Sequence, residues 1–370
     1  MDSCDVLIVG GGPAGSSLAW KLQKRGLDVV VLDKSRFPRD KVCAGWITPA
    51  ALALLQIDED EYSRDNVLQR VTGFRTGMMG GSGVLTRYEN TVSYGIRRSE
   101  FDHYLLGRSG ARLRLGEPLT TMQRGNGSWV VNNSVKTPLV VGAGGHFCPV
   151  SRFLRGNRER NESVVIAQEV EFEMDGAQQG DCRVRGDTPE LYFCDDLKGY
   201  GWCVRKGNFL NIGLGREDSL NLAEHVKSFC DYLKEKKRVP ANVPMNFRGH
   251  AYALYRGASQ STVDDGVMLI GDAAALAYPK SGEGIRPAIE SAFLAADVIL
   301  SAAGKYQREN LLPYPALLTE RFGKGDSIAE MLPQPLRRFM SRRLMESGWF
   351  TRHVLLDRWF LNIHQPALNR

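Results

Sequence analysis

The sequence predicts an α/β fold: a parallel sheet built from separated stretches of chain, an inserted α+β unit with an antiparallel sheet, and C-terminal helices. Three features support this. Near the N-terminus an apolar strand runs into a glycine-rich turn and a helix. A second strand, turn and helix follow residue 266. Between them, residues 163–247 alternate apolar and polar side chains in several short runs, which is typical of half-buried strands.

The N-terminal strand ends in a glycine motif with the spacing G-x-G-x-x-G. The apolar run Asp5–Val9 precedes Gly10–Gly15, and a helix-forming stretch of small residues follows. In this context Gly10 allows a sharp turn, Gly12 lets the backbone approach a pyrophosphate, and Gly15 lets the helix pack close to the strand. The helix N-terminus would direct unpaired N–H groups at the phosphates. The motif therefore predicts a dinucleotide site.

An acidic residue ends the next predicted strand. Val29–Leu32 is apolar and is followed by Asp33 and Lys34. A carboxylate at this place hydrogen-bonds the adenosine ribose in dinucleotide-binding folds. The two strands, the helix and the acid together predict a Rossmann-type domain.

A second motif, far downstream, indicates which dinucleotide binds. The strand Gly266–Ile270 runs into Gly271 and Asp272, and Gly282 and Gly284 open a helix that continues to about residue 300. Asp272 can accept hydrogen bonds from the hydroxyls of a ribityl chain, and the helix N-terminus can meet the anionic edge of a reduced flavin. A nicotinamide dinucleotide needs no such second half-site. We therefore expect FAD, bound non-covalently because no recognised covalent anchor is present.

Three further motifs are similar to those of a known family. Lys41–Gly45 is similar to K-x-C-G-G, with Ala44 in place of a glycine. Arg98 stands where an arginine approaches the flavin nucleotide, and Gly199–Trp202 looks like a Y-x-W segment that lines the cavity over the flavin. With the two glycine motifs, they make the chain resemble the geranylgeranyl reductase family of FAD-dependent oxidoreductases, within the para-hydroxybenzoate hydroxylase-like superfamily.

The resemblance covers about residues 5–300 and implies a reaction and a site. The implied reaction is hydride transfer from reduced flavin to a C=C bond of an isoprenoid or other lipophilic substrate. The resemblance also implies that Cys43 lies near the flavin and that Tyr200 and Trp202 line the substrate cavity. A reactive Cys43 would need surroundings that favour the thiolate, whereas burial would make it inert.

The chain also departs from related patterns. Gly144 stands where the superfamily has an aspartate, and Val204 and Arg205 replace an aromatic residue and a proline of the reductase pattern. Ala275 occupies a position where aromatic hydroxylases usually carry a histidine. The halogenases of the superfamily carry W-x-W before I-P, a pattern that Tyr200 and Arg205 break. The match therefore favours the reductases.

These arguments give two sets of candidate residues and no metal site. The candidate catalytic residues are Cys43, Tyr200 and Trp202. The candidate cofactor-binding residues are Gly10, Gly12, Pro13, Ala14, Gly15, Asp33, Lys34, Cys43, Ala44, Gly45, Arg98, Gly271, Asp272, Pro279, Gly282, Gly284 and Ile285.

The motifs also suggest a division into domains. We expect a discontinuous FAD-binding domain over residues 1–68, 95–160 and 250–300. The substrate domain would comprise residues 69–94 and 161–249, and residues 301–370 would form a C-terminal helical region.

Composition narrows the class of protein. A chain of 370 residues with 43% hydrophobic residues can hold two domains around one cofactor. Seven cysteines without C-x-x-C spacing argue against a disulfide framework or a zinc site and fit a reducing compartment. Neither a signal peptide nor a membrane-spanning run is predicted, so we expect a cytoplasmic protein.

Much of the net charge of +6 lies in a basic, aromatic tail. Its arginines are Arg337, Arg338, Arg342, Arg343, Arg352 and Arg358, interleaved with Phe339, Met340, Leu344, Trp349, Phe350, Trp359 and Phe360. Such a tail could contact an anionic membrane surface peripherally. Alternatively its aromatic side chains pack on the body of the protein and its arginines are solvated. Nucleic-acid binding is not expected, because no recognised module accompanies the charge.

Three functions remain open at this stage. The first is an alkene reductase acting on a small, lipophilic substrate. Gly142–Gly145 also follows a strand, but Phe147 occupies its third glycine position and makes it a poor second dinucleotide site, so NAD(P)H or another reductant would have to bind transiently. The second is a monooxygenase, a hydroxylase or epoxidase that uses NAD(P)H and O2. The third is a flavin-binding redox carrier or sensor without a small-molecule substrate. A long apolar cavity reaching the flavin would favour the first.

Overall fold

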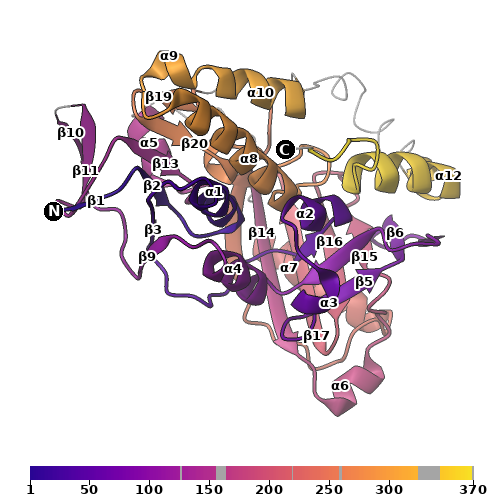
Figure 1. The fold of residues 1–370 in the computed structure, drawn as a ribbon. Helices are drawn as coiled ribbons and strands as arrows, with labels where there is room; N and C mark the ends of the chain where they lie inside the picture. Colours follow the sequence, from indigo (N-terminus) through magenta and orange to yellow (C-terminus); the bar gives the residue numbers. More distant parts are fainter. Residues whose placement is uncertain (126, 156–163, 219, 258–260, 324–341, 369–370) are drawn as a thin grey trace.

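The computed structural model describes residues 1–125, 127–155, 164–218, 220–257, 261–323 and 342–368 (Figure 1). Its nucleotide-binding half is built on a six-stranded sheet in the order β19-β20-β13-β2-β3-β9. These strands are β2 (Val6–Val9), β3 (Val29–Asp33), β9 (Arg112–Leu115), β13 (Leu139–Gly142), β19 (Val263–Asp264) and β20 (Val267–Leu269). All neighbouring strands run parallel except β19 and β20. The predicted Rossmann-type sheet, assembled from separated stretches of chain, is confirmed.

The inner strands of this sheet are apolar and buried. β2, β3, β13 and β20 are buried at every residue, as expected of parallel strands that are covered on both faces. The helices α1 (Pro13–Gln23) and α8 (Ile285–Ala302) pack against each other over the sheet (Figure 1). Beside them, α4 (Arg98–Gly107) packs on α1, and α5 (Pro149–Arg155) contacts β13 and β20.

The second half contains a seven-stranded sheet in the order β18-β14-β17-β16-β15-β6-β7. Its strands are β6 (Gly73–Met78), β7 (Val84–Arg87), β14 (Val164–Glu173), β15 (Glu190–Phe193), β16 (Gly199–Lys206), β17 (Phe209–Arg216) and β18 (Arg248–Ala253). All pairs are antiparallel except β15 with β6. The sheet therefore contains the predicted alternating stretches and also the strands that precede Tyr94.

Alternation gives the seven-stranded sheet two different faces, because successive side chains of a strand point to opposite sides. On β17, Leu210, Ile212 and Leu214 join the cluster that packs on helix α7 (Leu222–Glu235). Asn211 lies between them in sequence and faces the other way, where it accepts a hydrogen bond from the indole N–H of Trp202 on β16. This second face is directed towards the nucleotide-binding half and carries the polar residues of the site.

Two smaller sheets and one boundary were not predicted. One is a three-stranded sheet of β4 (Trp46–Ile47), β8 (Ser93–Ile96) and β5 (Leu68–Val71). The Ile96 N–H at the end of β8 also donates a hydrogen bond to the Gly45 carbonyl, just before β4. β1 (Asp2–Ser3), β12 (Val135–Thr137), β11 (Ser128–Val131) and β10 (Met122–Gly125) form a four-stranded sheet. The seven-stranded sheet also continues past residue 249, since β18 pairs with β14 as its edge strand.

The remaining described elements are short helices. They are α2 (Pro49–Leu54), α3 (Glu59–Tyr62), α6 (Gly176–Asp181), the 3-10 turn η1 (Gly271–Ala274), α9 (Arg308–Leu311), α10 (Pro313–Phe322), α12 (Gly348–Phe350) and the π-helix η3 (Thr351–Phe360). In the C-terminal part, Phe360 is 1% exposed whereas Trp349 is 67% exposed. The tail residues Arg337, Arg338, Phe339 and Met340 lie outside the described residues.

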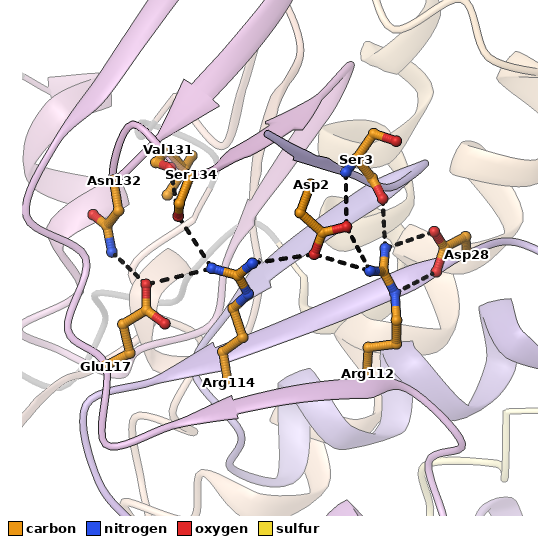
Figure 2. A network of polar contacts seen from close by, with 9 residues as sticks. All are labelled: Asp2, Ser3, Asp28, Arg112, Arg114, Glu117, Val131, Asn132 and Ser134. Atoms are coloured by element: carbon orange, nitrogen blue, oxygen red, sulfur yellow. Dashed lines mark hydrogen bonds and ion pairs between the residues drawn. The ribbon is translucent and has the colours of Figure 1, made fainter.

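A polar network joins the N-terminus to the edge of the six-stranded sheet (Figure 2). The Arg112 guanidinium donates to both carboxylate oxygens of Asp2 and of Asp28, at 2.7–3.0 Å. Arg114, two residues along β9, donates to Asp2 and to the Ser134 hydroxyl, each at 3.1 Å. These bonds fix β1 and the turn before β12 against β9, at a sheet edge that does not line the cavity described below.

Within the described ranges, no helix has the length and apolarity to cross a bilayer. The same part of the chain contains no cluster of three side chains suited to holding a metal ion.

Candidate active site

A cavity of about 590 Å³ lies between the two large sheets, and most of the candidate residues line it. Those on its wall are Gly10, Gly12, Pro13, Ala14, Asp33, Lys34, Cys43, Ala44, Arg98, Tyr200, Trp202, Asp272, Gly282, Gly284 and Ile285. Gly15, Gly45 and Gly271 are not on the wall. Pro279 does not line the cavity either. It lies in a turn in which the Gly282 N–H donates to the Tyr278 carbonyl, and this turn places Pro279 on the exposed surface.

The three motif glycines have different structural reasons to be glycine. Gly10 has φ +116°, and a β-carbon there would lie 2.4 Å from the Ala143 carbonyl oxygen. A β-carbon on Gly15 would lie 1.9 Å from the Gly10 oxygen, so Gly15 is needed for the close packing of α1 on the turn. At Gly12 the nearest atom would be an Arg39 nitrogen at 3.5 Å. Gly12 thus faces open space at the start of α1, where N–H groups can meet phosphate.

The Asp33 carboxylate is already bonded to the backbone of the turn. It accepts hydrogen bonds from Gly11 N–H at 2.7 Å and from Ser35 N–H at 2.8 Å. Asp33 therefore holds the glycine turn against the end of β3 in addition to lining the cavity.

The second motif places a carboxylate and two glycines on the opposite wall. Burial raises the pKa of Asp272, and the charges of Lys41 and Arg98 oppose that rise. Gly284 must be small because a β-carbon there would lie 3.0 Å from Oδ1 of Asp272. Gly282 has φ +71°, and its β-carbon would lie 2.3 Å from the Tyr252 hydroxyl oxygen.

Arg98 is a fixed guanidinium at the start of α4. It donates two hydrogen bonds to Asp102, at 2.8 and 2.7 Å, and the same carboxylate lies 3.3 Å from Arg39. Burial opposes the charge of Arg98, but Asp102 and Cys43 outweigh it and raise its pKa. The predicted Arg98 is thus on the wall beside Cys43, held in place by Asp102, which was not among the candidate residues.

Lys41 and His250 form a half-buried pair beside Arg98. The Lys41 Nζ lies 3.0 and 2.6 Å from the two His250 ring nitrogens. Burial, aided by the charge of Arg98, lowers the pKa of Lys41 to about 8. Burial and the neighbouring Lys41 lower the pKa of His250 to about 2, so its imidazole is neutral. Sequence reasoning did not place His250; Lys41 was noted only as part of the K-x-C motif.

Aromatic side chains form the remaining wall, from Trp46, Tyr200, Trp202, Tyr252 and Phe360. Phe360 of η3 lies against Trp46 and Tyr200, with ring centroids 5.6 and 5.4 Å apart. The Tyr200 hydroxyl donates to the Ser281 carbonyl. Nothing in the sequence pointed to Phe360 as a wall residue, because it was considered only as part of the tail.

Trp202 reaches Cys43 through Asn211. The Trp202 indole N–H donates to Asn211 Oδ1 at 2.7 Å, and Asn211 Nδ2 donates to the Cys43 carbonyl at 3.2 Å. Cys43 is half-buried, and its sulfur accepts the Gly45 N–H at 3.4 Å. Asn211 was missed by sequence reasoning. The signal was a polar residue on the inward face of an otherwise apolar strand, Leu210–Leu214.

These features fit an FAD molecule. The open cradle at Gly12 suits a pyrophosphate, the half-buried Asp272 carboxylate suits ribityl hydroxyls, and the N-terminus of α8 at Ile285 suits the anionic edge of a reduced ring. Beyond these groups the cavity continues to the aromatic wall, which suits an apolar substrate.

Comparison with known proteins agrees with an FAD cofactor. A family profile described as "FAD dependent oxidoreductase" matches residues 5–78. A menaquinone reductase of Mycobacterium tuberculosis is 32% identical, covering 90% of this chain and 83% of the relative. A digeranylgeranylglycerophospholipid reductase of Methanocaldococcus jannaschii is 26% identical, and the match covers 81% of this chain and 78% of the relative.

Solved structures share the fold. A geranylgeranyl bacteriochlorophyll reductase-like protein of Thermoplasma acidophilum superposes with a TM-score of 0.73 at 24% identity, covering 93% of this chain and 88% of that one. A flavin-dependent halogenase superposes with a TM-score of 0.69 at 20% identity, covering 94% and 71%. At these identities the likeness concerns the fold alone.

Proposed function

The chain belongs to the geranylgeranyl reductase family of FAD-dependent oxidoreductases, and on that premise we propose that it reduces a C=C bond in the isoprenoid part of a lipophilic substrate. The observation that carries this proposal is a single cavity that has a dinucleotide cradle at one end and an aromatic wall at the other. The relatives act, by their names, on menaquinone and on a geranylgeranyl lipid. Both molecules carry isoprenoid chains.

Each part of the wall has a task in such a reaction. Bound FAD supplies the hydride once it has been reduced. Trp46, Trp202 and Phe360 exclude water and present an apolar surface to the isoprenoid chain. Arg98 and Lys41 bring positive charge to the wall beside Asp272. Cys43 is held by Asn211 at the border between the charged and the aromatic regions.

The electron donor belongs to the same proposal. We expect NAD(P)H or another reductant to bind transiently, since Gly142–Gly145 follows a strand but Phe147 replaces its third glycine, which makes it a poor second dinucleotide site.

We further propose that the C-terminal tail contacts an anionic membrane from which a lipid substrate is drawn. The described part offers an exposed Trp349 (67%) and Leu344 (41%) next to the exposed Arg343. Trp349→Ala should reduce co-sedimentation with phosphatidylglycerol vesicles several-fold. Leu85→Ala, at another exposed apolar position, should leave it unchanged. Equal binding by wild type and Trp349→Ala would contradict this contact.

The reaction is tested by incubating the FAD-loaded protein with NADPH and a prenylated quinone or geranylgeranyl lipid without oxygen, followed by mass spectrometry. We expect a product heavier by two hydrogens. A product that forms only in air and is heavier by one oxygen would identify a monooxygenase. Electron transfer to a protein acceptor with every lipid unchanged would identify a carrier.

A further inference from the structure

A second, smaller cavity lies directly behind the segment that carries Cys43. Its volume is about 140 Å³, enough for a few water molecules. Residues 40–43 and Arg98 line both cavities, so they form the partition between them. The other walls of the rear cavity are mainly polar and come from Arg97, Ser99, Glu169, Glu171, Asn246 and Arg248.

The rear cavity opens towards solvent at an exposed ion pair. Arg248 of the edge strand β18 pairs with Asp40, and their side chains are 63% and 67% exposed. Glu169 of β14 lies at the inner end, where it is 7% exposed. Protons in bulk water therefore need to cross only this small polar space to reach Glu169.

Glu169 is linked to the Cys43 segment through the Asn211 side chain and through a hydrogen bond from the Cys43 backbone. Asn211 Nδ2 donates to Glu169 Oε2 at 3.3 Å and to the Cys43 carbonyl at 3.2 Å. The orientation of this amide is fixed by the Trp202 indole, which donates to its oxygen. Glu169 thus lies just behind the partition, on the side away from the aromatic wall.

The cations around Glu169 are engaged by other groups: Lys41 contacts His250, and the others pair with acids. The charged groups that face it are Asp40 and Lys41 of the partition, Arg97 just before α4, Arg98 of α4, Glu171 of β14, Lys206 of β16 and Arg248 of β18. Lys206 pairs with Glu171 at 2.6 Å, Arg97 with Glu171 at 3.3 Å, and Arg98 with Asp102. Within the described residues no ion pair reaches Glu169. Burial, opposed by the charge of Lys206, raises its pKa to about 7.

We propose that Glu169 and the rear cavity supply the proton of the reaction, delivering it from solvent to the Lys41–Cys43 partition. The inference rests on the proposed function. Reduction of one C=C bond requires a hydride, which comes from reduced FAD, and a proton. The hydride forms one new C–H bond, and the proton that leaves the Glu169 carboxyl and crosses the Lys41–Cys43 partition forms the other. The π bond is lost, the alkene is reduced and the flavin is oxidised. NADPH restores the reduced flavin, and Glu169 regains its proton from water in the rear cavity.

The variants that test this are Glu169→Gln, which removes the titrating group with little change in shape, and Glu169→Asp, which retains a carboxyl. Glu173→Gln, an exposed position on the same strand, is the matched control. In the FAD-loaded protein, the infrared band of a protonated carboxyl should titrate near pH 7 in wild type and in Glu173→Gln. The difference spectrum against Glu169→Gln separates it from the band of Glu283, whose pKa burial also raises to about 7.

The kinetic readout is the single-turnover oxidation of reduced FAD by the alkene. In wild type its rate should fall as pH rises through about 7, because the donor must be protonated. Glu169→Gln should lose this pH step and react on the order of 10²-fold more slowly, the lower range for general acid catalysis. Glu169→Asp should restore a pH step. The rate of FAD reduction by NADPH should be the same in all variants.

If Glu169→Gln kept the wild-type rate and pH step, the proton-delivery role of Glu169 would be overturned, while the proposed reductase function would stand. An equal loss of FAD affinity and of both half-reactions would also overturn that role, because it would indicate a merely structural one. If wild type transfers no hydride to any alkene, the proposed function fails and this inference with it; the infrared titration would still report the protonation of Glu169 independently.

Discussion

At the scale of single residues, the glycine motif combines positions that the fold requires with a position that the ligand requires. Gly10 and Gly15 would clash with backbone if they carried a β-carbon, whereas Gly12 would not. A side chain at Gly12 can therefore be accommodated by the folded chain but would project into the space that suits a pyrophosphate.

Gly12→Val should fold normally and fail to retain FAD. The valine methyl groups would occupy the phosphate cradle, and the loss should exceed 100-fold in affinity, equivalent to about 3 kcal/mol. The measurement is flavin absorbance of the purified variant together with its thermal unfolding. Gly125→Val, in an exposed strand with open space around it, is the control and should be yellow. A normally loaded Gly12→Val protein would show that the pyrophosphate lies elsewhere.

The site residues within the motifs could be predicted from the sequence, because the role of each glycine or acid depends on its position in a local strand–turn–helix pattern. Gly12, Asp272 and Gly284 all lie on the cavity wall. Partnerships formed between distant segments could not be predicted in this way. Lys41 contacts His250 across 209 positions of the chain, and no local pattern encodes that pairing.

At the scale of elements, the seven-stranded sheet determines what surrounds Cys43. Antiparallel pairing of β14 with β17 sets Glu171 opposite Asn211, and alternation then turns Glu169 to the same face. The sequence predicted these strands by their alternation. It did not predict that the polar positions would face the other domain, because alternation alone does not say which face is covered by α7 and which by the site.

The π-helix η3 contributes one aromatic residue, Phe360, to the cavity wall. Phe360→Ala should lower the free energy of unfolding by about 3 kcal/mol, as expected for removal of a buried phenylalanine side chain. The variant should also raise KM for the lipid substrate, because the wall against Trp46 and Tyr200 is lost. Denaturant unfolding and steady-state kinetics measure both.

Trp349→Ala is the control for this variant, since Trp349 belongs to the neighbouring α12 and is largely exposed. It should change the free energy of unfolding by less than about 0.5 kcal/mol. If both variants were equally stable, Phe360 would not be part of the packed wall.

At the scale of the whole molecule, the joint between the two large sheets buries ionisable groups, and this makes stability depend on pH. Both carboxylate oxygens of Glu283 are buried and have no hydrogen-bond partner in the described chain. Burial, opposed by the charge of Arg286, raises its pKa to about 7 from 4.5. A raised carboxyl pKa stabilises the folded state below pH 4.5, and this contribution is lost as pH rises through about 7.

Glu283→Gln should therefore gain stability relative to wild type as pH rises. Between about pH 5 and about pH 8 the difference in free energy of unfolding should grow by on the order of 2–3 kcal/mol. Denaturant unfolding of the FAD-free proteins at several pH values measures it, with Glu173→Gln giving a flat difference. A flat difference for Glu283→Gln as well would mean that its carboxyl is not desolvated in the folded state.

The central claim is that the cavity joins reduced FAD to an alkene. It is tested most directly by reducing the FAD-loaded protein without oxygen, adding one equivalent of an isoprenoid lipid, and following the return of oxidised-flavin absorbance. We predict reoxidation in the strict absence of oxygen, with one C=C bond saturated for each flavin oxidised. A flavin that stays reduced with every such lipid, and is reoxidised only by air, would contradict the account.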